Sequence, residues 1–397
     1  MALWIPSSAH ELEDAITTGS VVESHQLEFK ELADGGVIPN TVAKGVASLA
    51  IDGGVLVLGV GEDKSKGQWL TKPFALLGIR DRVDASLTTR ISPVLRLTYR
   101  PLDLGDGTGY LAIVVPQSLR APHMVDGKYY QRTDSGCKVC SDEEVRRLWL
   151  RHLDRREDRR AMLELEVNRE PVPFDQRRNA RLFVVAQPVS ADSRLLLESF
   201  ADRDLWRWTG PQAVFATSRT YAPSIGERCT TQRRARGVGY TNELESDRTV
   251  SQDLSTPRNV VDVELWEDGG VRLYYGRASD VIGGEQLLLL GAIAGEVSGV
   301  VELARLVSTQ AGFYGSWTFA VALRGLKSLR SHTSSLVSGE PQWRFSEDFY
   351  DESLEVDNAT LFDGGSPVLS ELLGRFLRAA YAYTTGIELL DVFPRDV

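Results

Sequence analysis

The sequence is poor in the residues that build disulfide frameworks and metal clusters: its 397 residues include three cysteines and five histidines. Three cysteines do not make the paired framework of a small secreted domain. No stretch reaches the ~18 consecutive apolar residues of a membrane helix. The first six residues, Met1 to Pro6, carry neither a basic segment nor a cleavage signature, so we predict no signal peptide. These absences predict a cytoplasmic protein with no membrane partner.

Positive charge is also in short supply, with 45 Lys and Arg against 55 Asp and Glu and a net charge of −10. The deficit is uneven. Residues 1–160 hold 21 basic and 22 acidic side chains, whereas the remainder holds 24 and 33. Local patches decide binding more than net charge does. We therefore expect any nucleic acid to bind the first part of the chain and not the acidic remainder.

The length predicts two domains, 1–160 and 161–397, each of the α+β class. In the first, Ser8 is an expected N-cap and Gly19 an expected helix end. Ser141 and Glu144 form a capping box that opens a helix to about residue 160. Expected helices cover 7–19, 41–50 and 83–91, and expected strands of a mixed sheet cover 21–32, 55–60, 94–99, 110–115 and 129–133.

In the second domain, the spacing of apolar residues again predicts both helices and strands, but we find no catalytic motif. Glu267 to Gly270 predicts a hairpin turn between two strands. Expected strands cover 181–186, 259–266, 271–275 and 315–323, and expected helices cover 284–311 and 366–384. The sequence does not indicate what this domain does, and sensing, regulation and assembly are the alternatives.

Acidic residues flank a predicted helix-turn-strand unit between Glu23 and Lys66. Glu23 and Glu28 precede the helix, and Asp63 follows the buried strand. Hard carboxylate oxygens suit Mg²⁺ or Mn²⁺, which activate water and stabilise phosphate charge. A metal site of these three acids is one interpretation. The other is that they are surface acids beside lysines, with Glu28 and Lys30 forming an ion pair.

The same stretch resembles the Schlafen-type AlbA-like domain. Glu23-Ser24 and Glu28-Phe29-Lys30 fit its opening Glu-Ser-x-x-x-Glu-Phe-Lys, and Gly53-Gly54 fits the glycine pair before its apolar strand. Glu62-Asp63-Lys64 fits its acidic strand end. Tyr130-Gln131-Arg132, followed by Ser135-Gly136, fits its Tyr-x-Arg and small-residue turn. The resemblance covers roughly residues 10–150.

This resemblance implies a mixed-sheet α+β domain that acts on nucleic acid. Some members cut structured RNA, tRNA in particular, with two glutamates and one aspartate at these places. The leading hypothesis is therefore a metal-dependent endoribonuclease in which Glu23, Glu28 and Asp63 are catalytic and hold Mg²⁺ or Mn²⁺. A bacterial stress or anti-phage role is its natural setting.

The resemblance leaves two alternatives open. Other members are described as DNA-binding, which predicts a non-catalytic nucleic-acid-binding regulator. A protein-interaction or ligand-sensing module is the third hypothesis. Members with two such lobes in one chain form a cradle, so a chain with one lobe is expected to form a homodimer or a higher homo-oligomer.

Basic side chains around the acids are the expected phosphate contacts, which give affinity without sequence readout. They are Lys30, Lys64, Lys66, Lys128 and Arg132. Tyr129 and Tyr130 are candidates to stack on a base, but we favour the interpretation that one fills the core and the other lies at the surface.

Three further patterns support more than one interpretation. Arg147, Arg151, Arg155 and Arg159 form a basic stripe, but interleaved acids also fit a solvated helix. A second basic island falls in an expected loop and consists of Arg228, Arg233, Arg234 and Arg236. Cys137 and Cys140 have the spacing of half a zinc site. The other candidates, His123, His152 and Cys229, do not supply a convincing second half.

Overall fold

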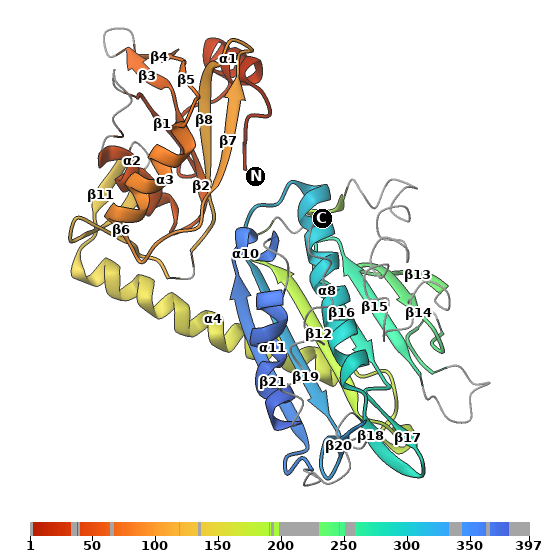
Figure 1. Ribbon diagram of the computed structural model, residues 1–397. Helices are drawn as coiled ribbons and strands as arrows, with labels where there is room; N and C mark the ends of the chain where they lie inside the picture. Colours follow the sequence, from red (N-terminus) through yellow and green to blue (C-terminus); the bar gives the residue numbers. More distant parts are fainter. Residues whose placement is uncertain are drawn as a thin grey trace. The chain divides into compact units, whose positions relative to one another are not determined.

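The protein is described here from a computed structural model. It describes residues 3–32, 38, 40–63, 67–118, 120–133, 136–189, 191, 194–197, 230–245, 247–250, 259–332, 344–362 and 366–380. The chain divides into two compact units (Figure 1). The first comprises Met1–Arg155 with Tyr314–Ser316, and the second comprises Arg156–Phe313 with Trp317–Val397.

The first unit is built around a mixed five-stranded sheet. β1 runs parallel to β2, β2 pairs antiparallel with β8, and both β5 and β7 pair antiparallel with β8. Every residue of β2 is buried, as its apolar sequence predicts. The strands are β1 Leu27–Lys30, β2 Gly54–Leu58, β5 Phe74–Ala75, β7 Thr98–Asp103 and β8 Thr108–Val115.

Two smaller sheets complete this unit. One has the order β11-β10-β9-β6, and the other is the β3–β4 hairpin. Their strands are β3 Val60–Asp63, β4 Gln68–Thr71, β6 Ile91–Ser92, β9 Met124–Val125, β10 Lys128–Thr133 and β11 Gly136–Val139.

The first three helices close the two faces of the mixed sheet. α1 has the predicted caps, because the Ser8 side chain accepts a hydrogen bond from Glu11 N and Gly19 adopts φ 66°. Leu12 of α1 packs with Phe29 and Val57, whereas Val46 of α2 packs with Leu56 on the opposite face. The helices are α1 Ala9–Thr18, α2 Asn40–Leu49 and α3 Ile79–Arg90.

A long helix, α4 Asp142–Asn168, begins with the predicted capping box. Glu144 N donates to Ser141 Oγ over 3.2 Å, and Ser141 N donates to Glu144 Oε2 over 2.7 Å. The helix continues beyond the expected end near residue 160. Leu148 packs in the core of the first unit and Leu163 packs against the sheet of the second.

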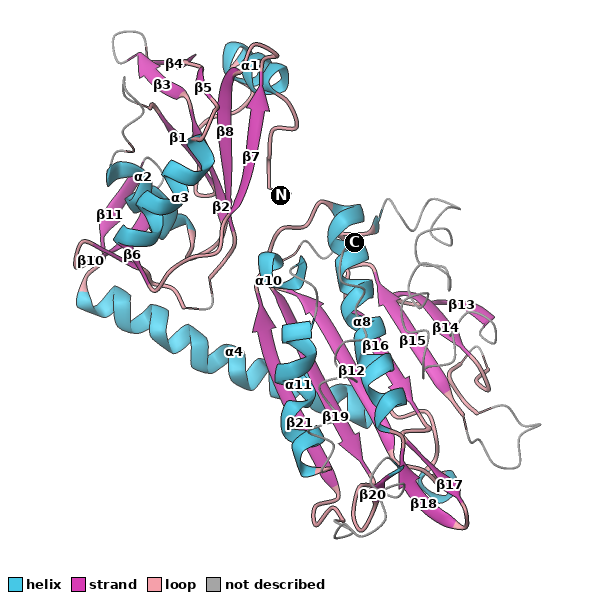
Figure 2. Cartoon of the chain, viewed as in Figure 1, coloured by secondary structure: helices cyan, strands magenta, loops and turns pink. Residues whose placement is uncertain are grey.

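The second unit contains a seven-stranded antiparallel sheet with the order β13-β14-β15-β16-β12-β19-β21 (Figure 2). Residues 267–270 connect β15 to β16 as the hairpin turn predicts. The strands are β12 Arg181–Pro188, β13 Thr230–Arg234, β14 Gly237–Thr241, β15 Val261–Trp266, β16 Val271–Tyr275, β19 Trp317–Arg324 and β21 Phe349–Val356.

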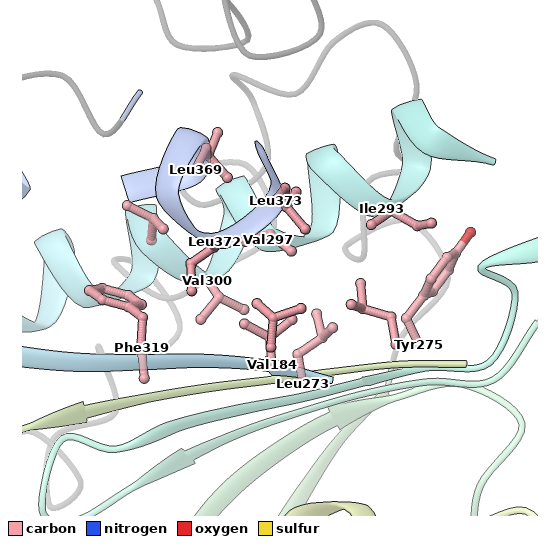
Figure 3. Packing of buried hydrophobic residues seen from close by; sticks show 14 of the residues in the cluster. Val184, Leu273, Tyr275, Ile293, Val297, Val300, Phe319, Leu369, Leu372 and Leu373 are labelled. Carbon is pink, nitrogen blue, oxygen red and sulfur yellow. The ribbon is translucent and has the colours of Figure 1, made fainter. Parts of the chain in front are cut away.

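Helices α8 and α11 cover one face of this sheet. Figure 3 shows Val297 and Val300 of α8 packed with Leu372 of α11 above Val184 and Leu273 of the sheet. Residues 285–288, which the sequence assigned to the helix, form a strand instead. The remaining elements are η1 Phe174–Gln176, β17 Ser279–Ile282, β18 Glu285–Leu288, α8 Leu290–Ala311, β20 Arg330–Ser331, α10 Asn358–Phe362 and α11 Ser366–Ala379.

The structure has the predicted fold class, since helices combine with a mixed sheet in the first unit and with an antiparallel sheet in the second. Within the described ranges, no helix is both long enough and apolar enough to cross a membrane.

The second basic island is not a loop surface. Arg234 ends β13 and reaches Asp262 Oδ1 at 2.6 Å, so its charge is neutralised inside the unit. Arg233 and Arg236 are exposed, and Arg228 lies outside the described residues. The prediction of a loop is wrong for Arg233 and Arg234, because both lie in β13, and cross-strand pairing brings Arg234 to buried acids.

Candidate functional site

The site is organised by β1 and the tight turn that precedes it. Ser24 N donates to Leu27 O over 3.0 Å, which folds residues 24–27 back on themselves. Side chains then alternate along β1. Leu27 and Phe29 enter the core shared with α1, whereas Glu28 and Lys30 share the other face, as predicted.

Glu28 is a buried carboxylate held by two cations. Its side chain is 1% exposed; Lys30 Nζ lies 2.6 Å from Oε1, and Arg132 Nη1 lies 2.5 Å from Oε2. Helix α2 closes a further side, because a Cβ added at Gly45 would lie 2.7 Å from Glu28 Oε2. The carboxylate is therefore enclosed by its counter-charges and by the backbone of α2.

Arg132 was predicted to contact phosphate, but its side chain is 2% exposed. In addition to Glu28, its Nη2 donates to Ser24 O over 2.6 Å and to Leu27 O over 3.1 Å. The guanidinium thus joins β10 to both ends of the turn before β1. A buried, fully oriented guanidinium does not fit a phosphate contact at the surface.

Glu23 is the more accessible of the two glutamates. Its Oε1 accepts a hydrogen bond from Phe29 N over 2.9 Å and lies 3.9 Å from Lys30 Nζ. Burial raises the pKa of the Glu23 carboxyl, while the Phe29 hydrogen bond and Lys30 oppose that rise. Glu23 is consequently a half-buried acid beside a lysine at the surface of the site.

The third predicted acid, Asp63, ends β3 in the separate two-stranded sheet. Among the residues that the structure describes, no three His, Cys, Asp or Glu side chains gather closely enough to hold a metal ion. The oxygens of Glu28 already face Lys30 and Arg132. As positioned, the predicted set of Glu23, Glu28 and Asp63 does not fit a Mg²⁺ or Mn²⁺ site.

The predicted lysines differ in their surroundings. The Lys30 side chain is 25% exposed, and Lys128 is exposed at the start of β10. Lys64 and Lys66, like Ser135 of the small-residue turn, lie outside the described residues. Lys44 on α2, which the sequence did not single out, lies 5.3 Å from the centre of the Tyr130 ring.

The tyrosine pair divides as the favoured interpretation predicts. Tyr130 is 8% exposed and belongs to the core with α2, whereas Tyr129 is half-buried. Tyr130 is therefore not an open stacking platform of the kind that binds unpaired bases.

Cys137 is partly enclosed by the fold and His123 is buried, and burial shifts the pKa of each. Burial, followed by the charge of Glu28, raises the pKa of the Cys137 thiol, and Lys30 and Lys44 act in the opposite direction. His123 Nδ1 lies 2.7 Å from Pro93 O, and burial lowers its pKa to about 4. Cys137 and Cys140 are free thiols, while Cys229 lies outside the described residues.

Two residues of the site escaped the sequence analysis. Gly45 was hidden in an ordinary helical pattern, although a helix-interior glycine often has a packing reason. Lys44 lacked a motif of its own. Its place in the site depends on the packing of β10 and β11 against α2, which joins distant parts of the sequence.

The site thus belongs to a mixed-sheet α+β module whose cations and acids gather where β1, α2 and β10–β11 meet. Residues 23–141 match the family model described as Schlafen, AlbA_2. The N-terminal part of the chain is therefore an AlbA/Schlafen-like domain. The family match supports a nucleic-acid-binding or nuclease-like function for this part of the chain.

Two solved structures are similar over parts of the chain. The N-terminal domain of a RecG-related protein from Nitrosomonas europaea is 24% identical, with a TM-score of 0.26, and covers 34% of this chain and 95% of its own. The DIP2311 protein from Corynebacterium diphtheriae is 19% identical, with a TM-score of 0.23. That match covers 51% of this chain but only 42% of the other. No curated protein matches the sequence.

Proposed function

We propose that the N-terminal unit binds nucleic acid through a lysine cluster, Lys30, Lys44 and Lys128, in which Lys44 and Lys128 contact phosphate and Lys30 balances the acids of the site. The observation that carries the proposal is the charge balance of the family-matched site. Glu23 and Glu28 are offset by Lys30 and Arg132, so Lys44 leaves a positive surplus at this place. A phosphate approaching the site therefore meets no net repulsion.

Two of these lysines are available for a ligand. Within the described ranges, Lys44 and Lys128 form no ion pair with a carboxylate, whereas Lys72 pairs with Glu31 at 2.6 Å. A lysine that already has a counter-charge gains less from a phosphate, because part of its field is cancelled. Lys72 thus provides a matched control for the loss of a lysine.

The test is fluorescence anisotropy with a labelled tRNA and a labelled DNA duplex between 50 and 200 mM salt. Lys44→Gln and Lys128→Gln should each weaken binding severalfold and reduce the slope of log K against log salt by about 1. Lys72→Gln should change both quantities much less. The proposal fails if the wild type binds neither ligand, or if all three variants lose affinity equally.

A second candidate is an endoribonuclease, with folded RNA such as tRNA as the substrate suggested by the resemblance. It is favoured by Glu23, whose raised pKa and partial access suit a group that moves a proton. Incubating the wild type with tRNA, with Mg²⁺, Mn²⁺ or chelator, tests this candidate on denaturing gels. Glu23→Gln should abolish cleavage without loss of binding. Intact tRNA in every lane would refute the endoribonuclease candidate and leave the binding proposal unaffected.

A homodimer remains the proposed assembly, since one lobe per chain would give a two-lobed cradle only by pairing. Light scattering of the purified chain, with and without tRNA, measures the mass directly. A single-chain mass in both samples would refute the paired cradle while leaving phosphate binding untouched.

A further inference from the structure

We infer that Glu28, Arg132 and Lys30 form an ionic lock that takes the place of a metal ion in this domain. Arg132 is then a positioning residue that holds the turn before β1 against the β10–β11 hairpin. This inference rests on the proposed function in one respect: it adds that nucleic acid binds without a divalent cation.

The Glu28 carboxylate is already neutralised by its neighbours. Each of its two oxygens already faces a cation, Lys30 on one side and Arg132 on the other. The Gly45 backbone leaves too little space for even a methyl group beside Oε2. At Oε2 a divalent ion would have to displace the buried Arg132 guanidinium, leaving that charge without its counter-charge in the core, and at Oε1 it would have to displace the Lys30 ammonium.

The Arg132 guanidinium connects β10 to the turn before β1. Its Nη2 spans Ser24 O and Leu27 O, the two carbonyls that close the turn. Its strand also carries Lys128 and pairs with the strand of Cys137. The lock therefore ties together the turn that carries Glu23 and the hairpin that carries a proposed phosphate contact.

A double-mutant cycle tests the lock in the full chain. Glu28→Met leaves the buried Arg132 guanidinium without its carboxylate, and Arg132→Met leaves Glu28 with Lys30 as its remaining cation, so each should lower the Tm, Glu28→Met by about 10 °C and Arg132→Met by less. Combining them removes both charges and substitutes two adaptable side chains. The Tm loss of the double variant should therefore be well below the sum of the two single losses. Losses that simply add would refute the lock.

The metal arm uses the same samples with Mg²⁺, Mn²⁺ or EDTA. The wild type should show the same Tm in all three, because no side chain of the lock needs the ion, and any change in Kd for labelled tRNA, whose phosphates Mg²⁺ itself screens, should be the same in the wild type and in Glu28→Met. A Tm or Kd that depends on the metal in the wild type and not in Glu28→Met would overturn the inference and restore the metal site.

The salt arm separates positioning from direct contact. If Arg132 only positions the turn, the double variant keeps the wild-type slope of log K against log salt, even if its affinity falls. A slope reduced by about 1 would show that Arg132 contacts phosphate and would refute the positioning role. Absence of binding by the wild type would refute the proposed function, whereas the Tm cycle would still judge the lock.

Discussion

Glu296 in α8 provides a quantitative test of how the second unit is packed. Its side chain is fully buried, and neither carboxylate oxygen has a hydrogen-bond partner in the described part of the chain. Neighbouring α8 residues, including Ile293 and Val297, face Tyr275 and Leu273 of the sheet (Figure 3). Burial raises the pKa of Glu296 from 4.5 to about 8.

The sign follows from comparing the two states. Below pH 4.5 the carboxyl is protonated in both the folded and the unfolded chain, so it contributes no pH dependence. Between pH 4.5 and 8 the unfolded chain releases the proton while the folded chain keeps it, and the free energy of unfolding falls. At ~1.4 kcal/mol per pKa unit, the loss is about 3 kcal/mol at pH 7 and about 5 kcal/mol above pH 8.

Glu296→Met should recover this free energy because it fills the space without an ionisable group. In urea unfolding followed by circular dichroism, we expect this substitution to raise the free energy of unfolding by about 3 kcal/mol at pH 7 and by much less at pH 4.5. Glu302→Met, on the same helix but paired with Arg305 at 3.0 Å, is the control and should show no such pH-dependent gain. A gain from Glu296→Met that is equal at pH 5 and pH 8.5 would refute the reasoning.

Two further substitutions probe close packing and buried charge. In thermal melts, Gly45→Ala should destabilise the first unit by about 1–3 kcal/mol, because the new Cβ would lie 2.9 Å from Leu56 Cδ1, and this outweighs the better helix propensity of alanine. Gly374→Ala, whose Cβ would lie 3.4 Å from Arg378 Nη1 and within 4 Å of no other side chain in the described residues, should be neutral or stabilising. Arg234→Met should cost about 1–3 kcal/mol in urea unfolding because Asp262, 0% exposed, loses one of its two arginine partners and keeps Arg248. Its exposed neighbour on β13 provides the control, and equal losses from Arg233→Met would contradict that explanation.

Features decided by neighbouring residues were predicted well. The Ser8 cap, the left-handed Gly19 and the Ser141–Glu144 box each need only three or four residues in sequence, and all are present. The 267–270 turn also joins its two strands as expected. The α8 boundary was missed because Glu285-Gln286-Leu287-Leu288 runs without a break into the apolar helical pattern, and pairing with β17 decides for the strand.

Features decided by distant partners were not predictable in the same way. The pairing of Glu28 with Lys30, two residues away, follows from strand alternation and was among the expected alternatives. The pairing of Glu28 with Arg132 joins residues 104 positions apart and depends on how β10 packs against β1. Both residues belonged to the motifs that carried the family resemblance, but their mutual contact changes what each can do.

The second unit shows why a run of like charges in a sequence does not define a binding surface. Arg234 lies over Gly239, where a Cβ would come within 2.5 Å of its Nε, and so crosses β14 to reach β15. Asp262 is shared with Arg248 at 2.6 Å, and Glu264 with Arg169 at 2.8 Å. Burial opposes ionisation of Glu264, but Arg248 and the other arginines lower its pKa to about 2. These arginines and acids therefore neutralise one another within the sheet. A nucleic acid drawn to them would have to compete with buried carboxylates, which leaves the lysines of the first unit as the better phosphate ligands.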